Sequence, residues 1–128
     1  GVGCRRGIGQ QAMEEAFAAL LAQSGLCAEA FYKVCSIDLK RDEPGLRAFC
    51  AAHGFAFETF SAAQLAAVAG RFSSSGFVQS VTGVDNVCER SAVLGSGGTL
   101  YCKKQAGGGV TMAAAMAPFA PDWRWQDE

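Results

Sequence analysis

The sequence predicts an α/β protein: a three-layer α/β/α sandwich with a mixed sheet of about five strands and a closing antiparallel hairpin. In the first half, segments rich in aromatic and β-branched residues alternate with segments whose apolar residues recur at the helical period. This alternation favours parallel strands covered by helices. Near the end, two strand-like segments flank the glycine run 107–109, which is typical of a hairpin.

The elements of the first half follow from local signals. Residues 1–4 are expected to end a short strand that runs into a glycine- and arginine-rich turn. Apolar residues spaced for one helical face then predict a helix that ends at Gly25. Residues 31–37 (FYKVCSI) predict the second strand, and Pro44 suits the first turn of a helix that ends at Gly54.

The second half contains shorter elements. Residues 55–60 alternate well enough for a third strand, and Ser61 is expected to cap a short helix. A serine- and glycine-rich loop over 70–76 then precedes two helical segments near 77–82 and 86–94. The hairpin strands are expected over 99–105 and 110–116. With 128 residues, the chain is expected to form one domain, residues 1–128, of which 118–128 is a tail.

Charge and hydropathy exclude several classes of function. The formal net charge is −1, from 11 basic and 12 acidic residues, so no global positive field would attract nucleic acid or an acidic membrane surface. No apolar segment approaches the roughly 18 residues that a membrane-spanning helix needs. We therefore expect a cytoplasmic protein that partners neither nucleic acid nor a membrane.

The cysteine pattern predicts free thiols rather than disulfides or a metal site. The chain has six cysteines and one histidine, dispersed without a C-x-x-C pair. In a chain of this size, such dispersion indicates reduced, buried thiols, and it predicts no zinc or iron–sulfur site and no cofactor. The cysteines are Cys4, Cys27, Cys35, Cys50, Cys88 and Cys102.

Cationic and glycine-rich segments follow the predicted strands, and this placement predicts an anion-binding site. In a βα unit the turn after the strand lies at the carboxyl edge of the sheet, where the next helix directs its free N–H groups. Gly3–Gly7 occupies that position and includes Arg5 and Arg6, which can grip carboxylates or phosphates. Lys40 and Arg41, which follow Asp38 after the second strand, are expected to emerge at the same edge. The serines around Ser74 offer hydroxyl groups before another helix, and strand alternation directs only one of Lys103 and Lys104 inward.

Several of these residues allow a structural or a chemical role. Cys4, near a helix N-terminus and two arginines, is either a thiol of lowered pKa or a small strand-end residue without contacts. Glu89 is a solvated acid, a partner for Arg5 or Arg6, or a general acid/base. His53, beside Gly54, is interpreted as a helix-terminal cation. The spacing of Gly1, Gly3 and Gly7 with Asp38 is also a weak match to a dinucleotide fingerprint.

Four motifs carry a resemblance to a known family. GVGCRRG opens the chain, SIDLKRDEPGL follows the second strand, FSAAQL follows the third, and KKQAGGGVTMAAA ends the hairpin. Together they resemble the CobE family, which is similar to the C-terminal domain of the cobalt-precorrin-5A hydrolase CbiG. The resemblance spans residues 1–116.

The resemblance implies a role in cobalamin biosynthesis, with an anionic tetrapyrrole or corrinoid as ligand and other pathway enzymes as possible partners. In the two-domain relative, the reaction opens a ring lactone and releases a two-carbon fragment. At 128 residues this chain has no room for the partner domain, so we expect the stand-alone form, for which hydrolase activity is not implied. The positions that match the family's motifs, and are thereby candidate binding residues, are Gly3, Cys4, Arg5, Arg6, Gly7, Asp38, Lys40, Ser74, Glu89 and Lys103 or Lys104.

Three functions stay open at this point. The first is a module that binds a precorrin or passes it between enzymes. The second is a hydrolase or isomerase that uses Cys4, Lys40 or Glu89 in chemistry. The third is a nucleotide-binding domain that uses Gly3–Gly7 and Asp38. The aromatic tail, with Trp123 and Trp125, either folds back on the domain or forms the interface of a homodimer.

Overall fold

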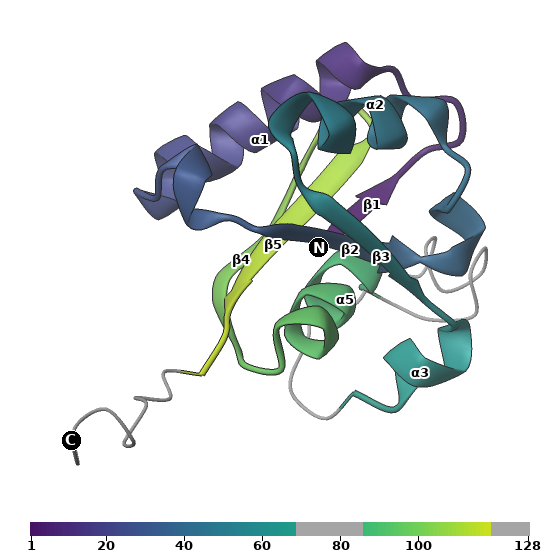
Figure 1. The fold of residues 1–128 in the computed structure, drawn as a ribbon, viewed down its shortest axis with the longest axis vertical. Helices are drawn as coiled ribbons and strands as arrows, with labels where there is room; N and C mark the ends of the chain where they lie inside the picture. The colour runs from purple at the N-terminus through teal and green to yellow at the C-terminus, as the bar shows by residue number, and fades with distance from the viewer. Residues whose placement is uncertain (69–85, 119–128) are drawn as a thin grey trace, which may run out of the picture.

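The structure, a computed structural model, describes residues 1–68 and 86–118 and has three layers (Figure 1). Two helices cover one face of the strands, and two others lie against the opposite face. The predicted α/β/α class is therefore confirmed. In chain order the elements are β1 (Val2–Cys4), α1 (Gln10–Ser24), η1 (Ala28–Ala30), β2 (Lys33–Ile37), η2 (Asp38–Lys40), α2 (Pro44–His53), β3 (Ala56–Phe60), α3 (Ala62–Ala66), α5 (Val87–Ser96), β4 (Thr99–Gly107) and β5 (Val110–Met116).

The five strands found in the described residues are divided between two hydrogen-bonded sheets. The order β1-β5-β4 is antiparallel throughout, whereas β2 and β3 pair in parallel. Where β1 meets β2, the Ser36 hydroxyl donates a hydrogen bond to the Val2 carbonyl over 2.7 Å. A side chain thus replaces backbone pairing at this point. The closing hairpin is confirmed, with Gly107 opposite Val110.

The helices α1 and α2 form the layer above the strands in Figure 1 and follow the predicted periodicity. In α1 the residues at the helical period, Met13, Phe17 and Leu20, are buried. Gly25 ends this helix with φ 74° and Gly54 ends α2 with φ 72°, a left-handed conformation that glycine adopts without strain. In α2 the buried Leu46, Phe49 and Cys50 join the same apolar core.

The opposite layer consists of α3 and α5. Ser61 caps α3 as expected, because its hydroxyl accepts from the Gln64 N–H while the Gln64 side chain accepts from the Ser61 N–H. Asn86 caps α5 from a left-handed conformation, with φ 50°. Leu65 and Val87 pack with residues of β2 and β3 in a second, smaller core.

Some expectations differ from the structure or lie outside it. The second strand begins at Lys33 rather than at residue 31, because η1 precedes it and Phe31 packs edge-on against Phe17, with ring centroids 5.4 Å apart. All six cysteines are free, but Cys27 is exposed, so the expectation of uniformly buried thiols was wrong there. In the part of the chain that the structure describes, no helix is long and apolar enough to cross a membrane. The loop over 70–76 with Ser74, the segment 77–82 and the aromatic tail lie outside the described residues.

Candidate functional site at the carboxyl edge

Three segments that are distant in sequence meet at the carboxyl ends of β1 and β2: the turn after β1, the loop after β2 and the tip of the β4–β5 hairpin. The first two lie on the right of Figure 1. The backbone N–H of Gly7, in the turn after β1, donates to both carboxylate oxygens of Glu43, at 3.0 and 3.3 Å. The N–H of Arg5 donates to the Gly109 carbonyl at the hairpin over 2.9 Å. We call the region formed by residues 4–9, 38–43 and 107–109 the carboxyl-edge site.

The start of α2 lies directly against the turn that follows β1. A Cβ atom added at Gly45 would lie 2.1 Å from the Ile8 carbonyl oxygen and 2.8 Å from the Gly9 carbonyl carbon. Only a residue without a side chain allows this approach. Pro44, at the first position of α2, fits a site where its missing N–H costs nothing. The Glu43-Pro44-Gly45 sequence therefore builds the junction between the two loops.

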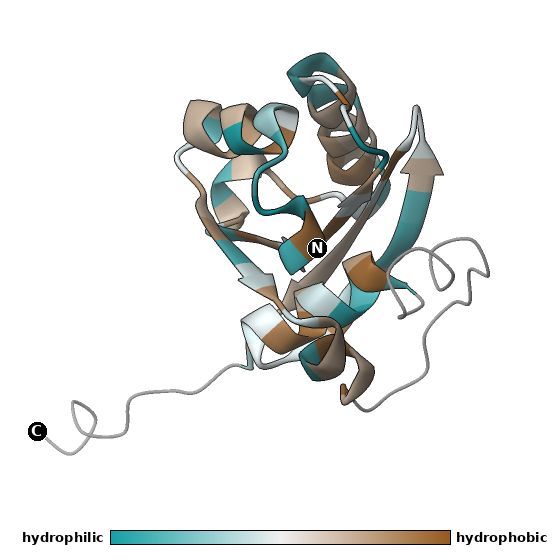
Figure 2. Ribbon diagram, turned by 90° about the vertical axis from the view of Figure 1, so that its right-hand side faces the viewer, coloured by the Kyte–Doolittle hydropathy of each residue, from teal (hydrophilic) through white to brown (hydrophobic). Residues whose placement is uncertain are grey.

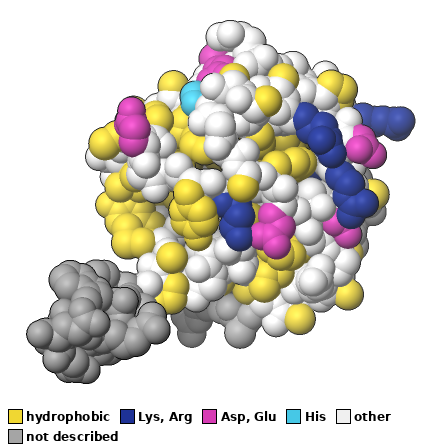
Figure 3. Space-filling model, in the orientation of Figure 1, with side chains coloured by type: hydrophobic (Ala, Val, Ile, Leu, Met, Phe, Trp, Pro, Cys, Tyr) yellow, Lys and Arg dark blue, Asp and Glu magenta, His cyan; other side chains and the backbone are white. Residues whose placement is uncertain are grey.

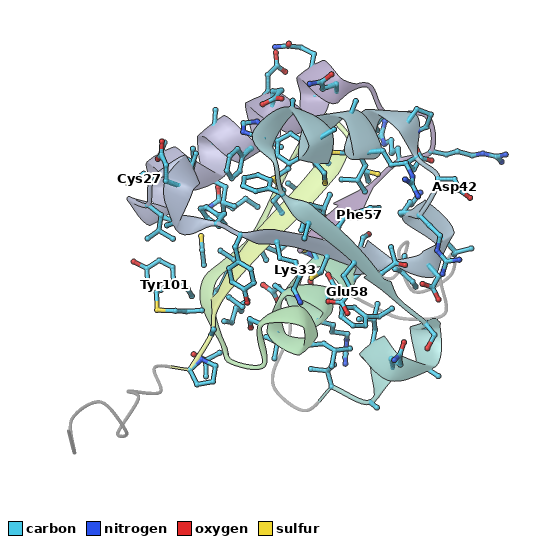
Figure 4. The ribbon with its side chains drawn as sticks, viewed as in Figure 1. Cys27, Lys33, Asp42, Phe57, Glu58 and Tyr101 are labelled. Carbon is cyan, nitrogen blue, oxygen red and sulfur yellow. The ribbon has the colours of Figure 1, made fainter. Side chains whose placement is uncertain are left out.

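Three cations of the site, unlike the neighbouring Arg41, have no ion-pair partner among the described residues. Arg5 and Arg6 are exposed and Lys40 is half-buried, and none of the three makes an ion pair with any residue of 1–68 or 86–118. Away from the site, Lys33 pairs with Glu58 over 2.6 Å, and the two side chains lie together on β2 and β3 in Figure 4. The carboxyl-edge site therefore holds cations whose charge is not neutralised by a described carboxylate.

The surrounding surface agrees with this placement. Figure 3 shows Lys and Arg side chains gathered on the right of the molecule, with acidic side chains among them. Figure 2 looks onto this edge and shows hydrophilic residues in the connection between β2 and α2. Within that connection, Asp38 is engaged by Arg41 over 3.0 Å, and the Arg47 guanidinium lies 3.9 Å from Asp42. Some of the cations are therefore locally paired, whereas Arg5, Arg6 and Lys40 are not.

Arg5 is positioned by its own aliphatic chain. Two of its side-chain carbons lie 3.1 and 3.4 Å from the place where a Cβ of Gly109 would be, and a methyl carbon of Ile8 lies 2.9 Å from it. The stem of Arg5 thus packs beside the hairpin while its charged end stays exposed. Gly109 permits this contact because it has no side chain.

A shallow groove opens beside the site, between α1 and the hairpin. Its volume is about 200 Å³, below the roughly 300–1,000 Å³ of pockets that enclose a drug-sized ligand. A large ring could therefore lie on this surface without being enclosed by it. The groove is lined by Ala12, Glu15, Ala16, Ala19, Gln105 and residues 106–108.

Cys4 lies at the site, but its thiol is not activated. Burial raises the pKa of the Cys4 thiol to about 11, the positive charge of Lys40 opposes that rise, and the negative charge of Glu43 adds to it. The alternative that Cys4 has a lowered pKa is therefore wrong. These charge effects also show that Lys40 and Glu43 both lie near Cys4, which brings the second loop to the end of β1.

We expect Cys4 to react slowly with iodoacetamide near neutral pH, because the thiolate is the reactive form and a thiol with a pKa of about 11 holds little of it. Its rate should rise continuously as the pH approaches 11. Cys27, which is exposed, provides the reference within the same molecule. Peptide mass spectrometry after timed labelling measures both rates. Equal labelling of Cys4 and Cys27 at pH 7.5 would contradict the assignment.

Glu89 is buried at the junction between α5 and β4. It is 1% exposed, so the expectation of a solvated acid was wrong. One carboxylate oxygen accepts from the Asn86 side-chain amide over 2.5 Å, and the other accepts from the Lys104 backbone N–H over 2.7 Å. These contacts fix the first turn of α5, where a negative charge is also favoured by the helix dipole.

The remaining predicted residues are placed as follows. In β4, Lys103 is exposed and Lys104 is half-buried, as the alternation of side chains along a strand predicts. His53 lies in the last turn of α2 as expected, and its Nε2 is 2.7 Å from a Glu14 carboxylate oxygen. No group of three His, Cys, Asp or Glu within residues 1–68 and 86–118 could hold a metal ion.

Sequence reasoning missed Glu43 and Gly45. Both stand in the motif SIDLKRDEPGL, where Glu43 resembled one more solvated charge in a polar connection. The sequence does contain one local signal for Glu43: it directly precedes a proline at the first position of a helix. A residue in that place lies where the start of a helix contacts neighbouring segments. The partner, Gly7, is 36 residues away and could not be identified from local pattern.

Comparison with known proteins identifies similar chains. The family model described as "Cobalamin synthesis G C-terminus" matches residues 1–115. The chain is 32% identical over 120 residues to a cobalt-precorrin-5A hydrolase of Priestia megaterium, covering 93% of this chain and 32% of that protein. It is also 32% identical over 117 residues to a cobalt-precorrin-5A hydrolase of Salmonella typhimurium, covering 91% and 33%. The chain thus spans about a third of the length of these curated relatives.

Two solved structures share the fold. One is CobE, a protein from the cobalamin (vitamin B12) biosynthetic pathway, with a TM-score of 0.81 at 28% identity, covering 88% of this chain and 84% of that one. The other is the cobalamin biosynthesis protein chiG of Agrobacterium tumefaciens strain C58, with a TM-score of 0.72 at 25% identity, covering 93% and 97%.

Proposed function

The chain belongs to the family of the cobalamin synthesis G C-terminus, and on this premise we propose that it binds an anionic precorrin or related corrinoid intermediate at the carboxyl-edge site. The family and fold establish a cobalamin biosynthesis protein of the CbiG and CobE type, which confirms the resemblance seen in the motifs. The chemical class of the ligand and its position at the carboxyl-edge site are proposed.

One observation carries the proposal: Arg5, Arg6 and Lys40 gather at one edge without an ion pair to any described residue. Corrinoid precursors carry several acetate and propionate carboxylates around a broad, largely apolar ring. Guanidinium groups bind carboxylates in a bidentate manner, and the groove beside the hairpin offers alanine and glycine surface for the ring. The Gly7 N–H is already bound to Glu43, so ligand carboxylates would be bound by side chains rather than by that amide.

Binding is a better-supported role for this site than catalysis. Of the three catalytic candidates, Cys4 has a thiol of raised pKa and Glu89 is engaged with the backbone of β4. Lys40 is the candidate that remains accessible, and an ammonium group alone does not define a reaction. The dinucleotide alternative has no support from Asp38, whose carboxylate pairs with Arg41.

We expect the double variant Arg5→Ala/Arg6→Ala to bind a metal-free corrinoid with free carboxylates at least about tenfold more weakly than the wild type. A charge-assisted hydrogen bond contributes roughly 1.5–3 kcal/mol, and about 1.4 kcal/mol corresponds to a tenfold change in affinity. Absorbance titration of the purified protein measures the affinity, because burial of the ring alters its spectrum.

Lys33→Glu is the matched control, because this single substitution changes the net charge by the same two units at a residue outside the carboxyl-edge site, where Lys33 pairs with Glu58. Its affinity should stay within about threefold of the wild type, since paired surface charges contribute little. Equal weakening in Lys33→Glu and in the double variant would show that net charge, rather than the Arg5–Arg6 loop, attracts the ligand. Absence of any spectral change with the wild-type protein would contradict binding itself.

A further inference from the structure

We propose that Glu43 is the positioning residue of the carboxyl-edge site: its carboxylate holds the loop that carries Arg5 and Arg6 against the loop that carries Lys40. The inference rests on the proposed function for its effect on ligand affinity. The structural contact on which it depends can be tested without a ligand.

Glu43 connects three segments through different atoms. Its carboxylate accepts from the Gly7 N–H with both oxygens, its own N–H donates to the Lys40 carbonyl over 3.2 Å, and its carbonyl accepts from the Arg47 N–H over 3.0 Å in the first turn of α2. The residue is only 9% exposed. A buried carboxylate needs such partners, because burial without hydrogen bonds is costly. Glu43 thus links the turn after β1, the loop after β2 and the start of α2.

The conformation of Gly7 makes this link specific. Gly7 has φ 79°, and its N–H points to Glu43 between the arginines and the start of α1. The neighbouring contact between Gly45 and the Ile8–Gly9 backbone holds α2 close enough for the carboxylate to reach. Without the carboxylate, the Gly7 N–H would lose its partner and the Arg5–Arg6 turn would be tied mainly by the bond from Arg5 to Gly109.

The charge of Glu43 and its hydrogen bond act in opposite directions on an anionic ligand. The negative charge lies near Cys4 and Lys40, as its effect on the pKa of the Cys4 thiol shows, and it would repel ligand carboxylates. The hydrogen bond, in contrast, sets the arginines in place. A substitution that keeps an acceptor oxygen but removes the charge therefore separates the two effects.

The experiment compares Glu43→Gln with Glu43→Ala. Glu43→Gln keeps one oxygen for the Gly7 N–H, so its affinity for the metal-free corrinoid should equal or exceed that of the wild type. Glu43→Ala removes the same charge and also the acceptor, so it should bind about tenfold more weakly, a change expected for one lost positioning contact. If Glu43→Ala binds as tightly as Glu43→Gln, Glu43 acts only through its charge and the proposal is overturned.

Amide hydrogen exchange of Gly7, measured by NMR without ligand, tests the contact directly. In the wild type this amide should be protected, and Glu43→Ala should exchange at least about tenfold faster, as expected for an amide that loses its acceptor. Gly25, whose N–H donates to the Leu21 carbonyl at the end of α1, should not change and reports whether the fold is intact. A Gly7 amide that is unprotected in the wild type overturns the proposal even if Glu43→Ala does not fold. If no corrinoid binds the wild type, the proposed function fails, while the Gly7 exchange still decides the role of Glu43.

Discussion

Replacing Gly45 with alanine is expected to destabilise the protein by about 3 kcal/mol, the upper part of the range for overpacking a close contact. The new Cβ would lie 2.1 Å from the Ile8 carbonyl oxygen, 2.8 Å from the Gly9 carbonyl carbon and 3.0 Å from the Gln10 nitrogen. All three atoms belong to the backbone, so no side chain can rotate to relieve the overlap. The start of α2 must therefore move away from the turn that follows β1. Urea unfolding followed by circular dichroism measures the loss.

Gly107→Ala is the matched control for this prediction. A Cβ at Gly107 would meet no atom within 4 Å, and the residue does not have a positive φ. Its free energy of unfolding should stay within about 0.5 kcal/mol of the wild type, as is usual for surface substitutions. If both variants lost the same stability, the intrinsic properties of glycine, rather than the close approach at Gly45, would explain the effect.

The larger elements of this fold could be predicted because their signals are local. The period of Met13, Phe17 and Leu20 predicts α1, and glycines at 25 and 54 end the two helices of the upper layer. The glycine run before Val110 predicts the hairpin. Each signal involves residues within a few turns of one another, where steric preference and hydrophobic periodicity act directly.

The division of the strands into two sheets has no comparable local signal. β1 contains three residues and pairs on one side with β5. On its other side it meets β2 through the Ser36 hydroxyl rather than a backbone ladder. A serine within an apolar strand is compatible with either arrangement. Whether β1 and β2 form a backbone ladder depends on how closely they approach in the folded chain. The sequence pattern of a single strand does not contain that information.

The candidate site was predicted in part, for the same reason. Arg5 and Arg6 could be identified because they stand between glycines after a strand, a position with a general geometric meaning in α/β proteins. The role of Glu43 could not be predicted, because it depends on the distant Gly7. The role of Glu89 could not be predicted either, because one of its partners is the backbone of Lys104, in a strand 15 residues away. Both acids stand in sequences that also suit solvated residues. Burial, which only the fold determines, distinguishes the two cases.

Glu89→Gln is expected to destabilise the protein by about 3 kcal/mol although it preserves the volume of the side chain. The carboxylate accepts from the Asn86 side-chain amide with one oxygen and from the Lys104 N–H with the other. A glutamine side chain has one amide oxygen and one amide NH₂ group, so in either orientation its NH₂ group would face one of these two N–H donors. The residue is 1% exposed, and water cannot readily replace the lost acceptor. Thermal and urea unfolding measure the change.

Glu58→Gln provides the comparison, because it makes the same chemical change in an exposed ion pair with Lys33. Its effect on the free energy of unfolding should stay below about 1 kcal/mol, since exposed ion pairs contribute little.

Ligand titration of the folded Glu89→Gln variant adds a second criterion. If Glu89 holds the first turn of α5 in place, the variant loses stability, but the folded variant keeps its affinity for the ligand within about twofold of the wild type. The affinity is kept because the carboxyl-edge loops retain their own contacts through Glu43 and Gly109. Unchanged stability with a loss of affinity would instead make Glu89 a residue of the binding site, and the structural assignment would be wrong.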